Sequence, residues 1–200
     1  MECTSSIITA LTSILSALIG GLITGFFTLR AVKSTFENQK KQSNKEEKKI
    51  TSSLLQGIHD ELETIGEGYK KQIGSKLDEL EDNEPMLDYA PLSGDYFPIY
   101  NGNTLIIGRI QDNNLRKNII KTYHIGTSMI DSIKMNNYII SKYEHACILY
   151  NSANTEVNKH HRDAYYAVLI KYASLLKEGH QMLLDSITTT LDEIKKTLEH

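Results

Sequence analysis

The feature that most constrains this chain is an apolar stretch near its N-terminus that carries no charge. No Asp, Glu, Lys or Arg occurs between Glu2 and Arg30, and residues 7–29 are rich in Ile, Leu, Ala, Phe and Gly. A helix needs roughly 20 residues to cross the hydrocarbon core of a bilayer, and this stretch has 23. We therefore predict a transmembrane anchor within residues 1–29.

Two alternatives stay open for this stretch: a cleaved signal peptide and a buried helix of a soluble fold. A signal peptide starts with positive charge, has a shorter apolar core and ends in small residues at its cleavage site. Here the start carries Glu2, and the apolar run leads directly into Phe26, Phe27, Leu29 and Arg30. The pattern favours an uncleaved anchor.

The residues that follow the apolar stretch are basic and indicate its orientation. Residues 30–49 hold seven Lys or Arg against three Glu, a net charge of +4, whereas residues 50–200 hold 15 against 21 acidic residues, a net charge of −6. Positive charge beside a membrane helix is retained in the cytoplasm. We expect a single-pass protein of the inner (plasma) membrane whose C-terminal domain is cytoplasmic.

The same basic residues predict which partners the chain has. They are confined to a juxtamembrane helix at residues 30–49, where an anionic membrane surface attracts them. The residues expected to contact that surface are Arg30, Lys33, Lys40 and Lys41. A nucleic-acid-binding surface would instead spread basic charge over the fold, so we expect the lipid bilayer and no nucleic acid.

Small residues recur at every fourth position of the predicted anchor. This small-residue ridge consists of Thr9, Ser13, Ala17, Gly21 and Gly25. Such a ridge lets two helix backbones approach closely, as in GxxxG pairs. Membrane helices are rich in small residues in any case, so chance composition is the alternative. We predict that the ridge drives self-association and that the chain is a homo-oligomer.

Residues 50–200 show the periodicity of helices. Apolar residues recur at steps of three and four in three segments, residues 50–80, 115–140 and 165–198. Asp112 is a suitable N-cap for the second segment, in which Asp131 and Asn137 could be buried polar residues that fix the register. The sequence predicts an all-α fold, with the transmembrane helix followed by an elongated antiparallel bundle of three long helices with coiled-coil-like packing.

One irregular insertion rich in Tyr and Pro interrupts the helical pattern, at residues 83–111. Tyr96, Phe97 and Tyr100 cluster within it. Aromatic residues of this kind are typical of interfaces, and equally of a loop packed onto a bundle. We keep both readings, a partner or ligand contact and core packing. Residues 105–110 could form a short helix or a buried strand, and we favour the helix because no partner strand is evident.

No residue pattern in the chain predicts a catalytic or metal centre. His59, Asp60 and Glu61 are adjacent, and adjacent residues on a helix point in different directions, so we interpret them as solvated surface. Glu156 and His160 are four apart and could face one ion, but an acidic residue near a helix start is favourable without any metal. We predict no catalytic residue, no cofactor and no metal.

Part of the chain resembles a group of known proteins. The similarity covers residues 54–143 and rests on Leu55-Gln56-Gly57-Ile58-His59, Asp95-Tyr96-Phe97, Tyr100-Asn101, Ile107-Gly108, Asp131 and Asn136-Asn137. On these residues the chain resembles uncharacterised bacterial single-pass membrane proteins with a cytoplasmic helical domain. The resemblance implies that layout and transfers no catalytic residue. Phage-defence effectors share the layout, which is an analogy of architecture alone.

Two hypotheses for function follow from these patterns. The leading one is a membrane-tethered, oligomeric helical scaffold or effector module without catalytic activity. The alternative is a membrane-anchored enzyme or ligand sensor with a site near residues 89–124. A cavity lined by convergent polar groups would favour the alternative, whereas a solid apolar core would favour the scaffold.

Overall fold

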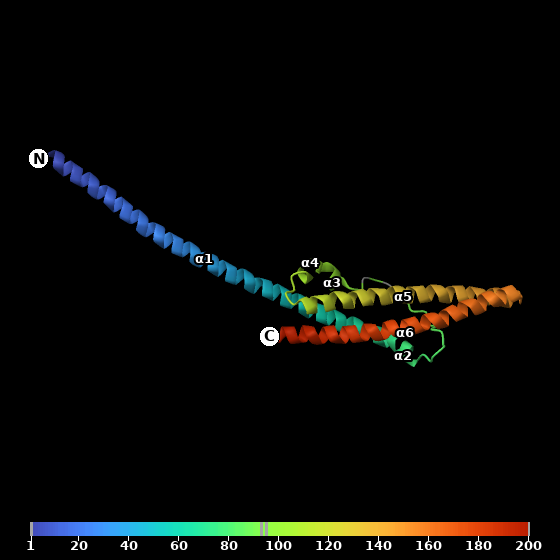
Figure 1. Ribbon diagram of the computed structural model, residues 1–200. Helices are drawn as coiled ribbons and strands as arrows, with labels where there is room; N and C mark the ends of the chain where they lie inside the picture. Colours follow the sequence, from blue (N-terminus) through green and yellow to red (C-terminus); the bar gives the residue numbers. More distant parts are fainter. Residues whose placement is uncertain (1, 93, 95, 200) are drawn as a thin grey trace. The chain divides into compact units, whose positions relative to one another are not determined.

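The computed structural model divides the chain into two units, residues 1–50 and residues 51–200. Its backbone is described for residues 2–92, 94 and 96–199, and side chains are described for these residues except 2–15, 17–19, 22 and 23. Within this described part every regular element is a helix (Figure 1). The prediction of an all-α fold is confirmed.

The first unit consists of the N-terminal part of helix α1 (Glu2–Tyr69). Every residue from Thr24 to Ile50 is exposed. Within the described residues, no helix combines the length and apolar character that a membrane span requires. The predicted anchor falls largely on side chains outside the described set, and so do Thr9, Ser13 and Ala17 of the small-residue ridge.

The second unit is a helical bundle. It contains the last turns of α1, then four short elements, and then two long helices. The short elements are the π-helix η1 (Lys70–Gly74), α2 (Ser75–Glu79), α3 (Pro98–Gly102) and α4 (Thr104–Ile107). The long helices are α5 (Asn113–Ser152) and α6 (Glu156–Leu198), which run side by side in opposite directions (Figure 1). Helix α4 confirms the preference for a helix over a strand at residues 105–107, whereas residues 108–110 lie outside the helix.

Side-chain caps fix where the two long helices begin. Asp112 Oδ1 accepts hydrogen bonds from the backbone N–H groups of Asn114 at 2.8 Å and Leu115 at 3.1 Å. Thr155 Oγ1 accepts one from the N–H of Asn158 at 3.2 Å. Each cap satisfies donors that a helix start leaves free and stabilises the helix by about 1 kcal/mol. The prediction of Asp112 as N-cap is confirmed.

The core of the bundle lies where α1, α5 and α6 meet. Ile58 of α1, Ile119 of α5 and Ile194 of α6 are completely buried in one apolar cluster. A second cluster joins Leu77 of α2 to α5 and α6. Burying each such side chain stabilises the fold by roughly 1.5–3 kcal/mol, so the bundle depends on all of these helices together.

Two asparagines of α5 attach the irregular insertion to the bundle. Asn137 Nδ2 donates to the Ala90 carbonyl at 2.7 Å, and its Oδ1 accepts from the Ala90 N–H at 3.2 Å. Asn136 Nδ2 donates to the Met86 carbonyl at 3.1 Å. Asn137 is buried as predicted, but Asp131 is exposed, so the prediction that Asp131 is a buried polar residue is wrong. It lies on the solvent side of α5, where Lys134 pairs with it at 3.5 Å.

Candidate functional site

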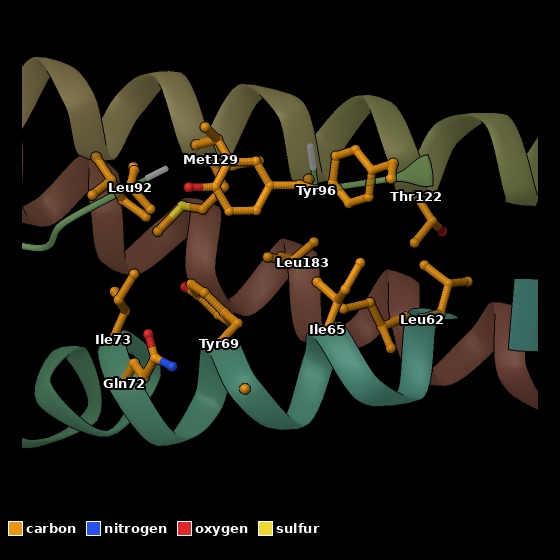
Figure 2. A pocket seen from close by; sticks show the side chains of 16 residues that line it. Leu62, Ile65, Tyr69, Gln72, Ile73, Leu92, Tyr96, Thr122, Met129 and Leu183 are labelled. Atoms are coloured by element: carbon orange, nitrogen blue, oxygen red, sulfur yellow. The ribbon is translucent and has the colours of Figure 1, made fainter. Parts of the chain in front are cut away.

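An apolar pocket of about 220 Å³ lies inside the second unit. Its walls come from the last turns of α1, η1, the segment before α3, α5 and α6 (Figure 2). The lining residues on α1 and η1 include Leu62, Ile65 and Ile73, those on α5 and α6 include Met129, Ile133 and Leu183, and the insertion adds Leu92, Tyr96 and Phe97. The pocket thus exists only because three distant parts of the sequence pack together.

Few polar groups face this pocket. Tyr96 contributes a hydroxyl that is buried and has no hydrogen-bond partner among the residues that the structure describes. Thr122 is also at the wall, but its hydroxyl is bonded to Ser186 Oγ at 2.7 Å and to Thr190 Oγ1 at 2.8 Å. Gln72 lines the pocket from an exposed position. The lining is therefore suited to an apolar group rather than to a charged one.

A chain of hydrogen bonds starts at the pocket wall and leads to the surface. Tyr69 Oη lies 2.9 Å from His180 Nδ1, and His180 Nε2 lies 3.0 Å from Asp78 Oδ1. When Nε2–H donates to the carboxylate, Nδ1 accepts from the Tyr69 hydroxyl. His180 is only 3% exposed, so both ring nitrogens need these partners.

The arrangement of Tyr69 and His180 is unsuited to a catalytic base or nucleophile. Burial, and next the charge of Asp78, raise the pKa of Tyr69 well above its ordinary value. A phenol that acts as a base or nucleophile needs a lowered pKa instead. The imidazole has no nitrogen left to receive a substrate proton, because Tyr69 and Asp78 occupy both. We interpret the three residues as a structural network behind the pocket wall.

Glu61 is the polar residue that sequence reasoning placed wrongly. The prediction made it solvated surface, but it is 7% exposed. Its carboxylate accepts from the N–H of Ile99 at 2.7 Å, the N–H of Tyr100 at 3.2 Å and the hydroxyl of Tyr123 at 2.6 Å. Burial, together with the hydrogen bond and charge of Glu61, raises the pKa of Tyr123 far above its ordinary value. The signal was the step of three from Ile58, which puts Glu61 on the apolar face of α1.

The three aromatic residues predicted as contacts divide into two groups. Tyr96 and Phe97 line the pocket, whereas Tyr100 stacks on Tyr123 with ring centroids 3.9 Å apart. Phe97 also meets Tyr123 edge to face at 5.1 Å. A side chain at Gly126 would lie 2.9 Å from the Phe97 ring, so glycine is needed there for the close approach. The aromatic cluster of the sequence is largely core packing, with Tyr96 and Phe97 turned to the pocket.

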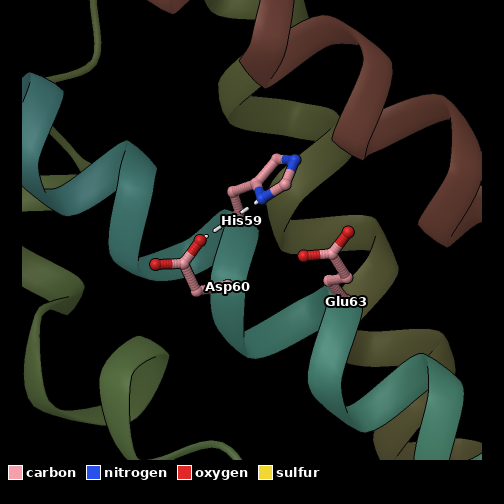
Figure 3. A group of neighbouring side chains, drawn as sticks. All are labelled: His59, Asp60 and Glu63. Carbon is pink, nitrogen blue, oxygen red and sulfur yellow. Dashed lines mark ion pairs between the residues drawn. The ribbon is translucent and has the colours of Figure 1, made fainter.

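His59, Asp60 and Glu63 form a second polar group on α1 (Figure 3). Their potential ligand atoms lie within 4.8 Å of one another, and His59 Nδ1 lies 3.4 Å from Asp60 Oδ1. The expectation that adjacent residues here stay apart is wrong for this pair, because their side chains bend toward each other. Both carboxylates are exposed, and exposed acidic groups of this kind are ordinary helix surface.

The other residues considered as metal ligands are Glu156 and His160. Both are exposed, and they do not belong to the metal-capable group found among the described residues. No family model, no curated protein and no solved structure matches this chain.

Proposed function

We propose that this chain is a single-pass, membrane-tethered helical module whose bundle lies in the cytoplasm and acts by binding rather than by catalysis. The observation that carries the proposal is the uncharged stretch at residues 7–29, followed at once by a segment of net charge +4. Helix α1 contains both and ends at Tyr69, in the wall of the bundle pocket. One helix thus connects the predicted membrane segment to the domain that binds.

Exposed apolar side chains support the membrane part of the proposal. Phe26, Phe27 and Leu29 are 62%, 63% and 73% exposed. Large apolar groups clustered at a surface mark contact with a membrane or a partner. The basic residues that follow, from Arg30 on, would lie against anionic headgroups.

The nature of the pocket supports binding over catalysis. Catalysis needs convergent polar groups whose pKa values suit proton transfer. In this pocket Thr122 is already hydrogen-bonded, and the raised pKa of Tyr69 opposes its use as a base. These contacts therefore do not support the alternative of an enzyme with a site near residues 89–124. The alternative of a ligand sensor is supported, because this range contributes side chains to the lining of a cavity: Leu92, Tyr96, Phe97 and Thr122.

The membrane proposal predicts the behaviour of reporter fusions in a bacterial host. An alkaline phosphatase fused after Lys49 or after Asn151 should stay inactive, because positive charge keeps both junctions in the cytoplasm. The unmodified chain should stay with membranes in high salt and in alkaline carbonate. Periplasmic activity of either fusion would contradict the orientation, and release by salt would contradict the span.

A charged variant separates insertion from surface adsorption. Leu18→Arg with Leu22→Arg puts two charges into the uncharged stretch, at roughly 2.5–3.5 kcal/mol each near the bilayer centre. This variant should appear in the alkaline supernatant. Phe36→Arg, which adds charge outside the stretch, should remain in the membrane pellet. Equal retention of both variants would mean that adsorption, not insertion, holds the chain.

A further inference from the structure

The lining of the bundle pocket excludes charged ligands. None of the described residues that line it is Asp, Glu, Lys, Arg or His. A buried carboxylate, phosphate or ammonium group would lose its hydration there without gaining a counter-charge, which strongly disfavours its binding. Nucleotides, metal ions and amino acids are therefore unsuited to this site, and a mostly apolar molecule is suited to it.

The hydroxyl groups of the pocket differ in whether they can form a hydrogen bond with a ligand. The Tyr69 hydroxyl is bonded to His180, and that of Thr122 is bonded to Ser186 and Thr190. The Tyr96 hydroxyl is buried and is not hydrogen-bonded to any described residue. A buried donor without a partner has lost its hydrogen bond to water without compensation, so an acceptor brought by a ligand would replace that lost hydrogen bond.

We propose that this pocket is a binding site for a small, uncharged, mostly apolar molecule with one hydrogen-bond acceptor, which the Tyr96 hydroxyl recognises. The volume of about 220 Å³ sets the size of the molecule, because an apolar cavity of roughly 150 Å³ in a protein core accepts benzene. One ring with a short substituent fits. An aryl ketone is the simplest molecule of this class.

The pocket is accessible from the surface at one edge. Gln72 is exposed and Gly68 and Leu92 are half-buried at its edge, whereas Met129 and Ile133 on its inner side are buried. A ligand entering past Gln72 would contact apolar side chains of α5 and α6. It would also reach the hydroxyl of Tyr96, which lies in the segment before α3 (Figure 2). The site lies within residues 62–187, so the inference stands whether or not the N-terminal stretch enters a membrane.

The test uses two probes of one shape. Acetophenone carries a carbonyl oxygen, and α-methylstyrene has a CH₂ group in its place. The full chain in lipid nanodiscs is labelled with ¹³C in its methionine methyl groups and titrated with each probe. The Met129 methyl lines the pocket and should shift in the ring current of a bound probe. Met135, which is 48% exposed on α5, should not shift, and a shift of its methyl group would indicate non-specific binding to the surface of the bundle.

Two substitutions distinguish the pocket from the rest of the surface. Ile65 points into the pocket from α1 (Figure 2), so Ile65→Phe should fill it and abolish the Met129 shift with both probes. Ile120→Phe is the matched control, because Ile120 is 44% exposed on the same bundle and does not line the pocket. This control should bind both probes as the parent does.

Tyr96→Phe tests the hydrogen bond itself and does not depend on Ile65→Phe folding. Net hydrogen-bond contributions of about 0.5–1.5 kcal/mol correspond to roughly twofold to thirteenfold in affinity. Tyr96→Phe should weaken the binding of acetophenone by that factor and leave the binding of α-methylstyrene unchanged, because only the ketone accepts a hydrogen bond from the hydroxyl. A Met129 methyl that shifts with neither probe overturns the proposal, and so does a shift that survives Ile65→Phe. If Tyr96→Phe leaves the affinity for acetophenone unchanged, the role of Tyr96 is overturned, and water satisfies its hydroxyl instead.

Discussion

Glu61 joins three parts of the chain through one carboxylate. It lies on α1 and accepts hydrogen bonds from two backbone groups at the start of α3 and from Tyr123 of α5. Both backbone donors need an acceptor, because they belong to the first turn of a helix whose N-cap residue, Phe97, provides no side-chain cap. Glu61 thus acts as a cap supplied from another helix, and its charge strengthens all three hydrogen bonds.

Glu61→Gln should lower the free energy of unfolding by roughly 1–3 kcal/mol. The amide keeps the size of the carboxylate but offers only one acceptor oxygen, and its NH₂ group would face a donor. Urea denaturation followed by circular dichroism measures the change. Glu67→Gln is the control, since Glu67 is exposed on the same helix and its replacement should change stability by less than about 0.5 kcal/mol. Equal stabilities of the two variants would show that the Glu61 hydrogen bonds contribute no net stability.

At the scale of elements, the π-helix η1 changes which face of the following helix, α2, continues the buried face of α1. It spans Lys70–Gly74 and separates α1 from α2 without a turn or a break. A π-helical turn contains an extra residue and shifts the face of the helix that follows. Gly74 ends the element, and a Cβ at this position would lie 2.9 Å from His180 Cε1. The close approach lets His180 reach Tyr69 and Asp78 together.

Gly74→Ala and Gly68→Ala should change stability in opposite directions. A methyl group at Gly74 displaces the buried His180 ring and weakens its two hydrogen bonds, with an expected loss of roughly 1–3 kcal/mol. At Gly68 a Cβ meets no described atom within 4 Å, so alanine should add up to about 1 kcal/mol through helix propensity. Thermal unfolding measures both changes, and ¹⁵N chemical shifts of the His180 ring should move only in Gly74→Ala. An unchanged His180 spectrum would contradict the packing argument.

At the scale of the whole molecule, the two units differ in what stabilises them. The bundle of residues 51–200 has apolar clusters shared between helices. Among the described residues of the first unit, none is buried. A helix without a buried face gains little from packing within its own chain. The proposed membrane and a second copy of the helix are the surroundings that would supply such packing.

Replacing Gly21 and Gly25 together by Ile should abolish self-association of the predicted anchor. Neither position has a described atom within 4 Å of a Cβ, so the change meets no obstacle within the chain. Two β-branched side chains would hold neighbouring backbones apart while they keep the segment apolar. A transmembrane association assay should lose its signal while membrane insertion is unchanged. Phe36→Ile, outside the ridge, is the control; undiminished association of the double variant would place any oligomer contact in the bundle.

Local physical chemistry let the sequence determine the helices of this protein. Apolar residues recur at steps of three and four in residues 115–140, and the Asp112 side chain caps the helix start next to it. Both effects act between residues a few positions apart, so they can be interpreted without knowing what the helix packs against. For residues 105–110 the sequence favours a helix only because no partner strand is evident. The uncharged stretch at residues 7–29 predicts an anchor from composition alone, and that prediction stays a prediction.

Only the tertiary structure decided which polar residues are buried and where a cavity forms. Glu61 looks like a surface acid in the sequence, because its three donors lie 38, 39 and 62 residues away. His180 is 102 residues from Asp78 and 111 from Tyr69, and no local pattern connects them. The site that the sequence suggested near residues 89–124 stays a prediction. A cavity is a property of how side chains from several helices fill the space between them, so only the tertiary structure locates one.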